Sequence, residues 1–167
     1  ARMIISEEVD KYVIEAAYDN IHITANNILM LSDRDGYRHL YLYNMNGILK
    51  RSVCPASTDI TAVYGYDEKT GDIFYQAAPT PMTRHIFVQH ANGKTQRLSQ
   101  REGVNDARFS ASLQYYFNTW SDRNTPYVCT SNSRDGKVIS TLEDNKDLRE
   151  RLAAYDIPER ELFSFTT

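Results

Sequence analysis

The stretch Arg38-His39-Leu40-Tyr41-Leu42, followed by Asn44-Met45-Asn46-Gly47, recurs 46 residues later in this chain. The second copy reads Arg84-His85-Ile86-Phe87-Val88, followed by His90-Ala91-Asn92-Gly93. A third, weaker copy pairs Pro126-Tyr127-Val128-Cys129-Thr130 with Ser133-Arg134-Asp135-Gly136. Self-similarity at such a period is typical of architectures built from one repeated supersecondary unit.

A second motif gives the same period independently. Ser32-Asp33-Arg34-Asp35 recurs as Ser121-Asp122-Arg123-Asn124, an offset of 89 residues. The glycines Gly47 and Gly136, which belong to the first motif, are separated by the same 89 residues. Two motifs at different points of the repeat therefore agree in register.

Each repeat predicts four short strands separated by tight turns. Asn46-Gly47, Asn92-Gly93 and Asp135-Gly136 tolerate the positive φ angles of hairpin turns and mark strand reversals. The predicted strands cover residues 20–25, 28–33, 38–44 and 48–53, then 60–66, 73–78, 83–90 and 95–99, then 106–110, 113–120, 126–132 and 137–142. Four short strands per repeat of this length are typical of a propeller blade.

Both faces of the predicted strands are apolar or aromatic, as in Leu40-Tyr41-Leu42-Tyr43 and Ile86-Phe87-Val88. A sheet that faced water on one side would alternate polar and apolar residues. The pattern predicts an all-β fold, a partial β-propeller of about three four-stranded antiparallel blades, at about 12–55, 56–101 and 102–143. Sheets stacked in a solenoid would give a similar pattern.

After residue 143 the pattern changes. Asp144-Asn145 is a helix N-cap pair, Leu148, Leu152 and Tyr155 follow at helical spacing, and Pro158 ends the helix. Residues 161–166 are expected to form one more strand. The segment 144–167 is interpreted as a short helix and exit strand that leave the propeller.

Composition excludes several classes of protein. The chain has 167 residues, a net charge of −3 and a pI of about 5.8, which give no basic surface for nucleic acid. A hydrophobic content of 41% argues against disorder. No apolar run approaches the ~20 residues of a membrane span.

The two cysteines and four histidines carry no sequence signature of a site. Cys54 and Cys129 match no metal motif and fall in different repeats, so they are expected to be unbridged thiols. His39 and His85 occupy equivalent repeat positions, which favours a structural role. His22 and His90 complete the set of histidines.

No catalytic motif is present in the sequence. No glycine pair forms the Gly-x-Ser-x-Gly elbow of an α/β hydrolase, and no local signature activates a cysteine. Ser32–Gly36 lacks the carboxylates of a calcium loop and is interpreted as a hairpin turn. Glu7-Glu8 could anchor an ammonium group, but a solvated pair is expected. We assign no catalytic, cofactor-binding or metal-binding residue and no cofactor.

The segment Ser32–Tyr43, which contains Asp-Gly-Tyr-Arg-His-Leu, resembles the N-terminal propeller of the dipeptidyl peptidase IV family within the prolyl oligopeptidase group of serine peptidases. Val63-Tyr64-Gly65-Tyr66-Asp67, Arg84-His85-Ile86 and the stretch 138–145 leading to Leu148, Leu152 and Pro158 extend the resemblance. It runs from about residue 12 to residue 167.

The resemblance implies that the propeller and the catalytic residues belong to separate domains. In this family an eight-bladed propeller caps a hydrolase domain that carries the Ser, Asp and His triad. The triad is therefore expected beyond residue 167, and the chain itself is expected to have no peptidase activity. The family's substrate-binding glutamate pair lies in an earlier blade, so its role is not transferred to Glu7-Glu8.

The parent protein is then expected to remove X-Pro dipeptides from peptide N-termini. These blades would restrict substrate access and support the missing hydrolase domain. The expected partners are peptide substrates, the hydrolase domain and the remaining blades, and the resemblance suggests a periplasmic, cell-envelope or secreted parent.

Two other functions stay open. One is a non-enzymatic propeller that serves as a protein-binding scaffold. The other is a propeller glycosidase, which would need acidic residues at the innermost strands, and 60–63 and 107–109 have none. Blades cut from a ring are expected to expose apolar end faces, carrying residues such as Leu40, Leu42, Ile86, Val88 and Tyr115. The isolated chain is therefore expected either to self-associate through these faces or to be only marginally stable.

Overall fold

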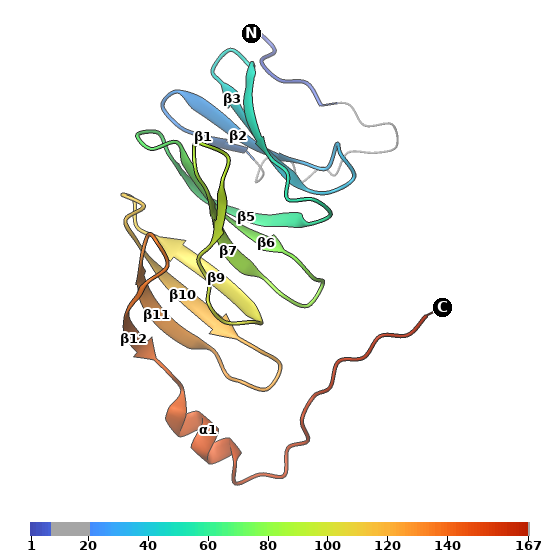
Figure 1. Ribbon diagram of the computed structural model, residues 1–167, viewed down its shortest axis with the longest axis vertical. Helices are drawn as coiled ribbons and strands as arrows, with labels where there is room; N and C mark the ends of the chain where they lie inside the picture. Colours follow the sequence, from blue (N-terminus) through green and yellow to red (C-terminus); the bar gives the residue numbers. More distant parts are fainter. Residues whose placement is uncertain (8–20, 167) are drawn as a thin grey trace.

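The computed structural model describes residues 1–7 and 21–166, in which three four-stranded antiparallel sheets follow one another along the long axis (Figure 1). The first sheet contains β1 (Ile21–Ile23), β2 (Asn27–Ser32), β3 (His39–Asn44) and β4 (Leu49–Val53). The second contains β5 (Asp59–Asp67), β6 (Asp72–Ala78), β7 (His85–Gln89) and β8 (Thr95–Arg97). The third contains β9 (Val104–Phe109), β10 (Tyr115–Ser121), β11 (Val128–Ser133) and β12 (Val138–Glu143).

Strand order in each sheet follows chain order, so each blade is a meander of hairpins. The third and fourth strands are joined in every blade by a turn that ends on a glycine with positive φ, at Gly47, Gly93 and Gly136. A side chain would strain that conformation. The predicted blades and their hairpins are confirmed.

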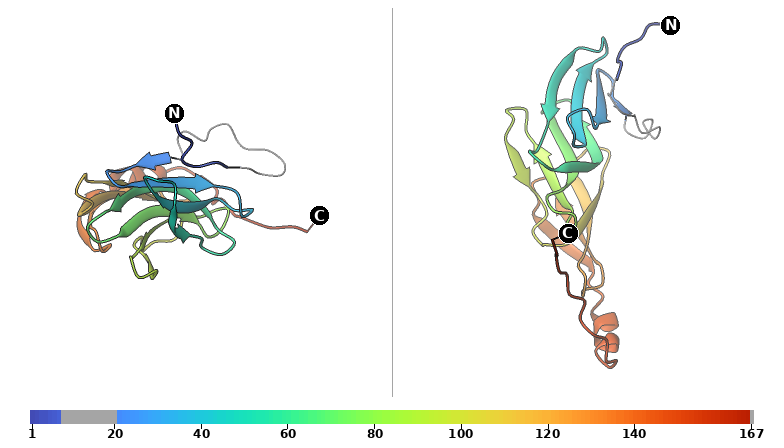
Figure 2. Two further views of the ribbon diagram at one scale, coloured as in Figure 1. Left: turned by 90° about the horizontal axis from the view of Figure 1, so that it is seen from above. Right: turned by 90° about the vertical axis from the view of Figure 1, so that its right-hand side faces the viewer.

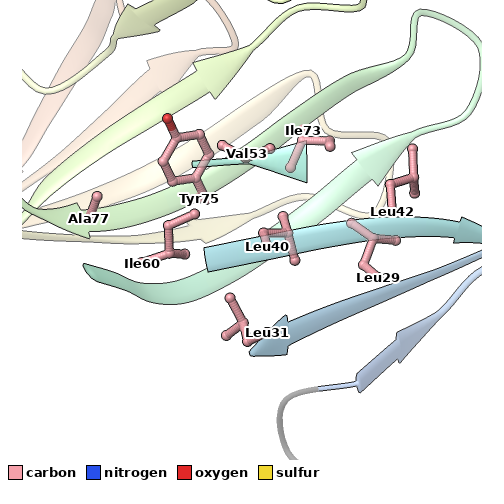
Figure 3. Close-up of a cluster of buried hydrophobic side chains, with 9 residues drawn as sticks. All are labelled: Leu29, Leu31, Leu40, Leu42, Val53, Ile60, Ile73, Tyr75 and Ala77. Carbon is pink, nitrogen blue, oxygen red and sulfur yellow. The ribbon is translucent and has the colours of Figure 1, made fainter. Parts of the chain in front are cut away.

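The first and second sheets share an apolar core. Nine buried side chains from both sheets meet there, as Figure 3 shows: Leu29, Leu31, Leu40, Leu42, Val53, Ile60, Ile73, Tyr75 and Ala77. One face each of β2, β3 and β6 supplies most of this cluster. Their opposite faces are buried too, as at Tyr41 and Phe74, so their sequences do not alternate with polar residues.

A second core joins the second sheet to the third. Its buried residues are Phe74, Ile86, Val88, Leu98 and Tyr116. The Phe109 ring packs between Phe74 and Tyr116, with centroid separations of 4.8 and 4.7 Å. The middle sheet is therefore covered on both faces.

The expectation about open end faces is wrong for four of its five residues. Leu40 and Leu42 lie in the first core, and Ile86 and Val88 lie in the second. Only Tyr115, which is 59% exposed, lies on an open face. The sequence could not show this, because a strand with two apolar faces does not reveal which face meets which neighbour.

The outer face of the first sheet is also covered. Ile28, Met30, Tyr41 and Tyr43 form a buried cluster, against which Ile5 packs. Both views in Figure 2 place the N-terminal segment beside the first sheet, on the side away from the second. The third sheet thus holds the open face.

The expectation that Glu7 belongs to a solvated acidic pair is wrong. Its side chain is only 14% exposed, accepts a hydrogen bond from the Ser32 hydroxyl, and lies 3.8 Å from Arg34 Nε. It is therefore not part of a solvated pair. Glu8 lies outside the described residues.

The C-terminal tail differs from the prediction. The helix α1 (Lys146–Leu152) ends before Tyr155, and none of its residues is buried. Asn145 has a positive φ and makes no side-chain cap bond, whereas Asp144 Oδ1 accepts the Lys146 amide at 2.9 Å. Residues 161–166 form no strand, and Phe163 and Phe165 are exposed. An extended run becomes a strand only when a neighbour pairs with it, and Figure 1 shows the tail running clear of the sheets.

No helix in the described part of the chain is both long enough and apolar enough to cross a bilayer. Cys54 and Cys129 are free thiols, as predicted.

Candidate functional site

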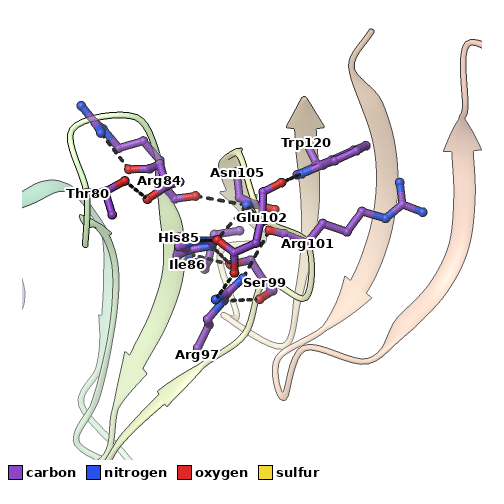
Figure 4. A network of polar contacts seen from close by, with 11 residues as sticks. Thr80, Arg84, His85, Ile86, Arg97, Ser99, Arg101, Glu102, Asn105 and Trp120 are labelled. Atoms are coloured by element: carbon purple, nitrogen blue, oxygen red, sulfur yellow. Dashed lines mark hydrogen bonds and ion pairs between the residues drawn. The ribbon is translucent and has the colours of Figure 1, made fainter. Parts of the chain in front are cut away.

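A histidine-centred polar network lies at the junction of the second and third blades (Figure 4). His85 begins β7 and is buried. Its Nδ1 lies 3.0 Å from Ser99 Oγ, and its Nε2 lies 3.2 Å from Glu102 Oε2. Serine, histidine and carboxylate are thus linked in sequence as in a hydrolase triad, but the serine faces Nδ1 and the carboxylate faces Nε2, the reverse of that triad.

This network is closed to a substrate. Ser99 is buried, and its Oγ already accepts the Ile86 amide at 3.2 Å. The Asn105 side-chain amide, which is fully buried, lies 3.4 Å from His85 Nδ1 and donates to the carbonyls of Arg84 and Arg101. A nucleophile needs an open approach for the reacting carbonyl, so this array is a structural junction rather than a catalytic site.

The partners of His85 define its protonation. The Glu102 carboxylate can only accept a hydrogen bond from Nε2, and the Ser99 hydroxyl, whose oxygen accepts the Ile86 amide, can donate to Nδ1, so Nδ1 is the acceptor. Nε2 then carries the proton and donates to Glu102. Burial lowers the pKa of His85, the Arg97 charge lowers it further, and Glu102 opposes both. The ring is therefore neutral near pH 7.

Arg97 and Trp120 hold Glu102 in place. Arg97 Nη1 donates to Glu102 Oε1 at 2.8 Å, and this bond lowers the pKa of the Glu102 carboxyl. Trp120 Nε1, from β10, donates to the Glu102 carbonyl at 2.6 Å. The loop between the second and third blades is thereby fixed to both.

A second junction is built on the turn between β5 and β6, residues 67–72, which we call the bracing turn. Arg134, from the hairpin between β11 and β12, lies 3.0 Å from Asp67 Oδ2 and 2.7 Å from Asp72 Oδ2. Burial raises the pKa of Asp67, but Arg134 and the amides of Lys69 and Thr70 outweigh it, and the net shift is downward. The third blade is thereby tied to the second by charge-assisted hydrogen bonds.

The same turn reaches the first blade. Glu68 accepts hydrogen bonds from the Thr24 hydroxyl, the Asn26 amide at 3.0 Å and the Asn27 side chain at 3.0 Å. Arg51, from β4, donates to the Gly71 carbonyl at 2.6 Å. One turn of six residues therefore contacts all three blades.

Acid is expected to loosen this junction. The bonds from Thr24, Asn26 and Asn27 lower the pKa of Glu68 from 4.5 to about 2. Because the folded-state pKa is depressed, the stabilisation is fully present above the unfolded-state pKa and is lost as the pH falls from 4.5 towards 2. Urea unfolding at pH 6 and pH 3 should give a larger difference between the chain and its Glu68→Gln variant at pH 6. An equal difference at both pH values would contradict this assignment.

The structure does not bring the four histidines together. His22 lies in exposed β1, and His39 and His85 begin equivalent strands in different blades. His90 Nδ1 lies 3.0 Å from Asp72 Oδ1, beside the bracing turn. Sequence reasoning missed the roles of Glu68, Arg134 and Asn105, because none of them recurs between repeats.

Three four-stranded sheets, joined in chain order and tied through shared turns, define a run of β-propeller blades. The family model described as "Dipeptidyl peptidase IV (DPP IV) N-terminal region" matches residues 1–127, and the chain belongs to this family.

Similar proteins agree with this assignment. Dipeptidyl peptidase 4 of Arthroderma otae is 30% identical over 138 residues, which are 80% of this chain and 18% of that protein. The crystal structure of Porphyromonas gingivalis dipeptidyl peptidase 4 matches 91% of this chain and 22% of that one, with a TM-score of 0.87 and 37% identity. TolB of Acinetobacter baumannii shares the fold alone, at 21% identity and a TM-score of 0.52 over 68% of this chain and 28% of that one. The chain thus spans about a fifth of the length of the curated relatives it matches.

Proposed function

We propose that this chain forms three consecutive propeller blades of a dipeptidyl peptidase that removes X-Pro dipeptides from peptide N-termini. In this proposal the blades restrict access to the catalytic chamber and help to seat the hydrolase domain. The observation that carries the proposal is the superposition on Porphyromonas gingivalis dipeptidyl peptidase 4, which combines a TM-score of 0.87 with 37% identity.

Rigid blades suit the role of a filter, because a fixed opening excludes folded proteins by size. The bracing turn and the His85 network supply that rigidity, since each ties neighbouring blades through buried or charge-assisted hydrogen bonds.

Two parts of the chain are exposed in ways that suit contact with other parts of a larger peptidase: the open face of the third sheet and the C-terminal segment. The third sheet carries a shallow apolar hollow of about 290 Å³, lined by residues that include Phe109, Tyr115, Phe117 and Ile139. We assign this face to the blade that packs against it when the ring is closed. We assign residues 144–167 to the passage towards the hydrolase domain, because α1 and the tail bury no side chain against these blades.

The proposal can be tested with a chimera. This chain would replace the matched blades of Porphyromonas gingivalis dipeptidyl peptidase 4, and release of p-nitroaniline from Gly-Pro-p-nitroanilide would be measured. The chimera is expected to turn over this substrate and short X-Pro peptides, and to leave folded proteins with the same N-terminus intact. The isolated chain is expected to release no product.

The unaltered Porphyromonas gingivalis enzyme and the isolated chain serve as controls. A chimera that folds, judged by circular dichroism and its melting curve, but has lost turnover would favour a non-enzymatic scaffold. Activity of the isolated chain that survives purification, and disappears with a point substitution in it, would place catalysis in these blades and overturn the proposal.

A further inference from the structure

His39 and His85 occupy equivalent positions in the first two blades, but the residues that face them across the strand ladder differ in chemistry. In the first blade Tyr41 pairs with Ser52, and in the second Phe87 pairs with Arg97. Continuing each ladder places Cys54 opposite His39, at the position that Ser99 takes opposite His85. The first blade thus holds a thiol where the second holds a hydroxyl.

His85 has partners on both ring nitrogens, Ser99 and Glu102. His39 is equally buried, with a side chain only 6% exposed, yet neither of its nitrogens has a hydrogen-bond partner among the described residues. A buried polar group without a partner is costly, and in native structures it calls for an explanation, of which a bound ion or water is one.

The groups around His39 are metal ligands by type. Asp35 comes from the turn between β2 and β3, and Cys54 directly follows β4. The ligand atoms of Asp35, His39 and Cys54 all lie within 4.8 Å of one another. His39 Nδ1 lies 3.8 Å from Asp35 Oδ2.

We propose that Asp35, His39 and Cys54 form a binding site for a divalent metal ion of the zinc class, with water as the fourth ligand. Thiolate and imidazole together select zinc or cobalt over magnesium or calcium. Ligand atoms of a tetrahedral zinc ion stand about 3.3–3.7 Å apart, given bonds of about 2.0–2.3 Å. Asp35 and Cys54 are exposed and lie outside the strands, so they can close this difference.

A neighbouring tyrosine orients the carboxylate. The Tyr41 hydroxyl donates to Asp35 Oδ2. Hydrogen bonds of this kind fix ligating carboxylates in metal sites. Arg34, whose guanidinium lies 4.3 Å from the Tyr41 ring centre, is held near Glu7, which offsets its charge.

The second blade lacks this chemistry, although its histidine is in the same place. Ser99 replaces the thiol, and Arg97 engages the carboxylate of Glu102. Recurrence of the histidine in the sequence favours a structural role for both copies. The pairing of the strands shows that the two copies differ, because His39 faces a cysteine and His85 faces a serine.

Cobalt is the probe for this site, because a thiolate bound to Co²⁺ gives a charge-transfer band in the near ultraviolet. The 167-residue chain, kept reduced, would be titrated with Co²⁺ and then with Zn²⁺. We expect one ion per chain, the thiolate band, loss of the band on addition of Zn²⁺, and a rise in melting temperature with Zn²⁺.

Two variants test the ligands, and a third is the control. Cys54→Ser is expected to abolish the band, and Asp35→Asn is expected to weaken Co²⁺ binding on the order of 10–100-fold. Cys129→Ser is the matched control and should leave both the band and the affinity unchanged. Since Cys54 and Asp35 are exposed, their variants should keep the strand signal in circular dichroism.

A band that survives Cys54→Ser, or that disappears in Cys129→Ser, would overturn the proposal. Equal Co²⁺ affinity in 6 M urea would also overturn it, because it would show that the unfolded chain binds the ion through its thiols alone. None of these readouts depends on peptidase activity.

Discussion

Replacing Phe74 by alanine is expected to lower the free energy of unfolding by about 3–5 kcal/mol, a large part of the roughly 5–15 kcal/mol that stabilises an ordinary domain. Phe74 is fully buried between the second and third blades. It packs on Phe109, and the Arg134 guanidinium lies 5.3 Å from its ring centre. The substitution removes a ring from the second core and also leaves the ion pairs of the bracing turn without their apolar support.

Urea denaturation followed by circular dichroism would measure this loss. Phe163→Ala is the matched control, because Phe163 is exposed in the tail and lies outside the open face of the third blade, so its loss should change the midpoint little. A Phe74→Ala variant as stable as Phe163→Ala would mean that the two blades do not depend on their shared core.

The isolated chain is expected to self-associate through the open face of its third blade. Tyr115, Phe117 and Ile139 are each at least half exposed there and line the same apolar hollow. Each Å² of apolar surface left in water forgoes roughly 25 cal/mol of burial. Because the outer face of the first blade is buried, with Ile5 of the N-terminal segment packed on it, the residues that the structure describes leave one open blade face, and one face favours a closed dimer over a filament.

Sedimentation velocity over a range of concentrations would test this expectation. Combining Tyr115→Thr, Phe117→Thr and Ile139→Thr should shift the chain towards monomer, while keeping residues that suit strands. Tyr155→Thr, in the exposed tail, is the control and should leave association unchanged. A monodisperse monomer at high concentration, with a sharp cooperative melt, would show that the third blade is self-sufficient.

The blades could be predicted from sequence because their signals are local. Hairpin glycines and apolar strands lie within one repeat, and the repeat placed each strand to within about two residues of its observed ends. The bracing turn could not be predicted, since Glu68 and Arg134 meet partners about 40 to 67 residues away and neither residue recurs.

Two errors have the same physical origin. Residues 161–166 have the composition of a strand, but pairing depends on a neighbour that the local sequence does not encode. The open face was assigned to Leu40 and Ile86 because apolar character does not distinguish a covered face from an open one. The contrast between His39 and His85 was hidden for a similar reason, since it depends on which residue lies across the ladder.

The bracing turn also sets an order of assembly during synthesis on the ribosome. Its bonds to Thr24 and Arg51 can form as soon as residue 72 has emerged, because those partners precede it. Arg134 emerges about sixty residues later, and the ion pair between Arg134 and Asp67 cannot form before then. In a nascent chain stalled before residue 134, we therefore expect the first two blades to be packed together but the bracing turn to open readily. Once the hairpin between β11 and β12 has formed, Arg134 holds the turn closed.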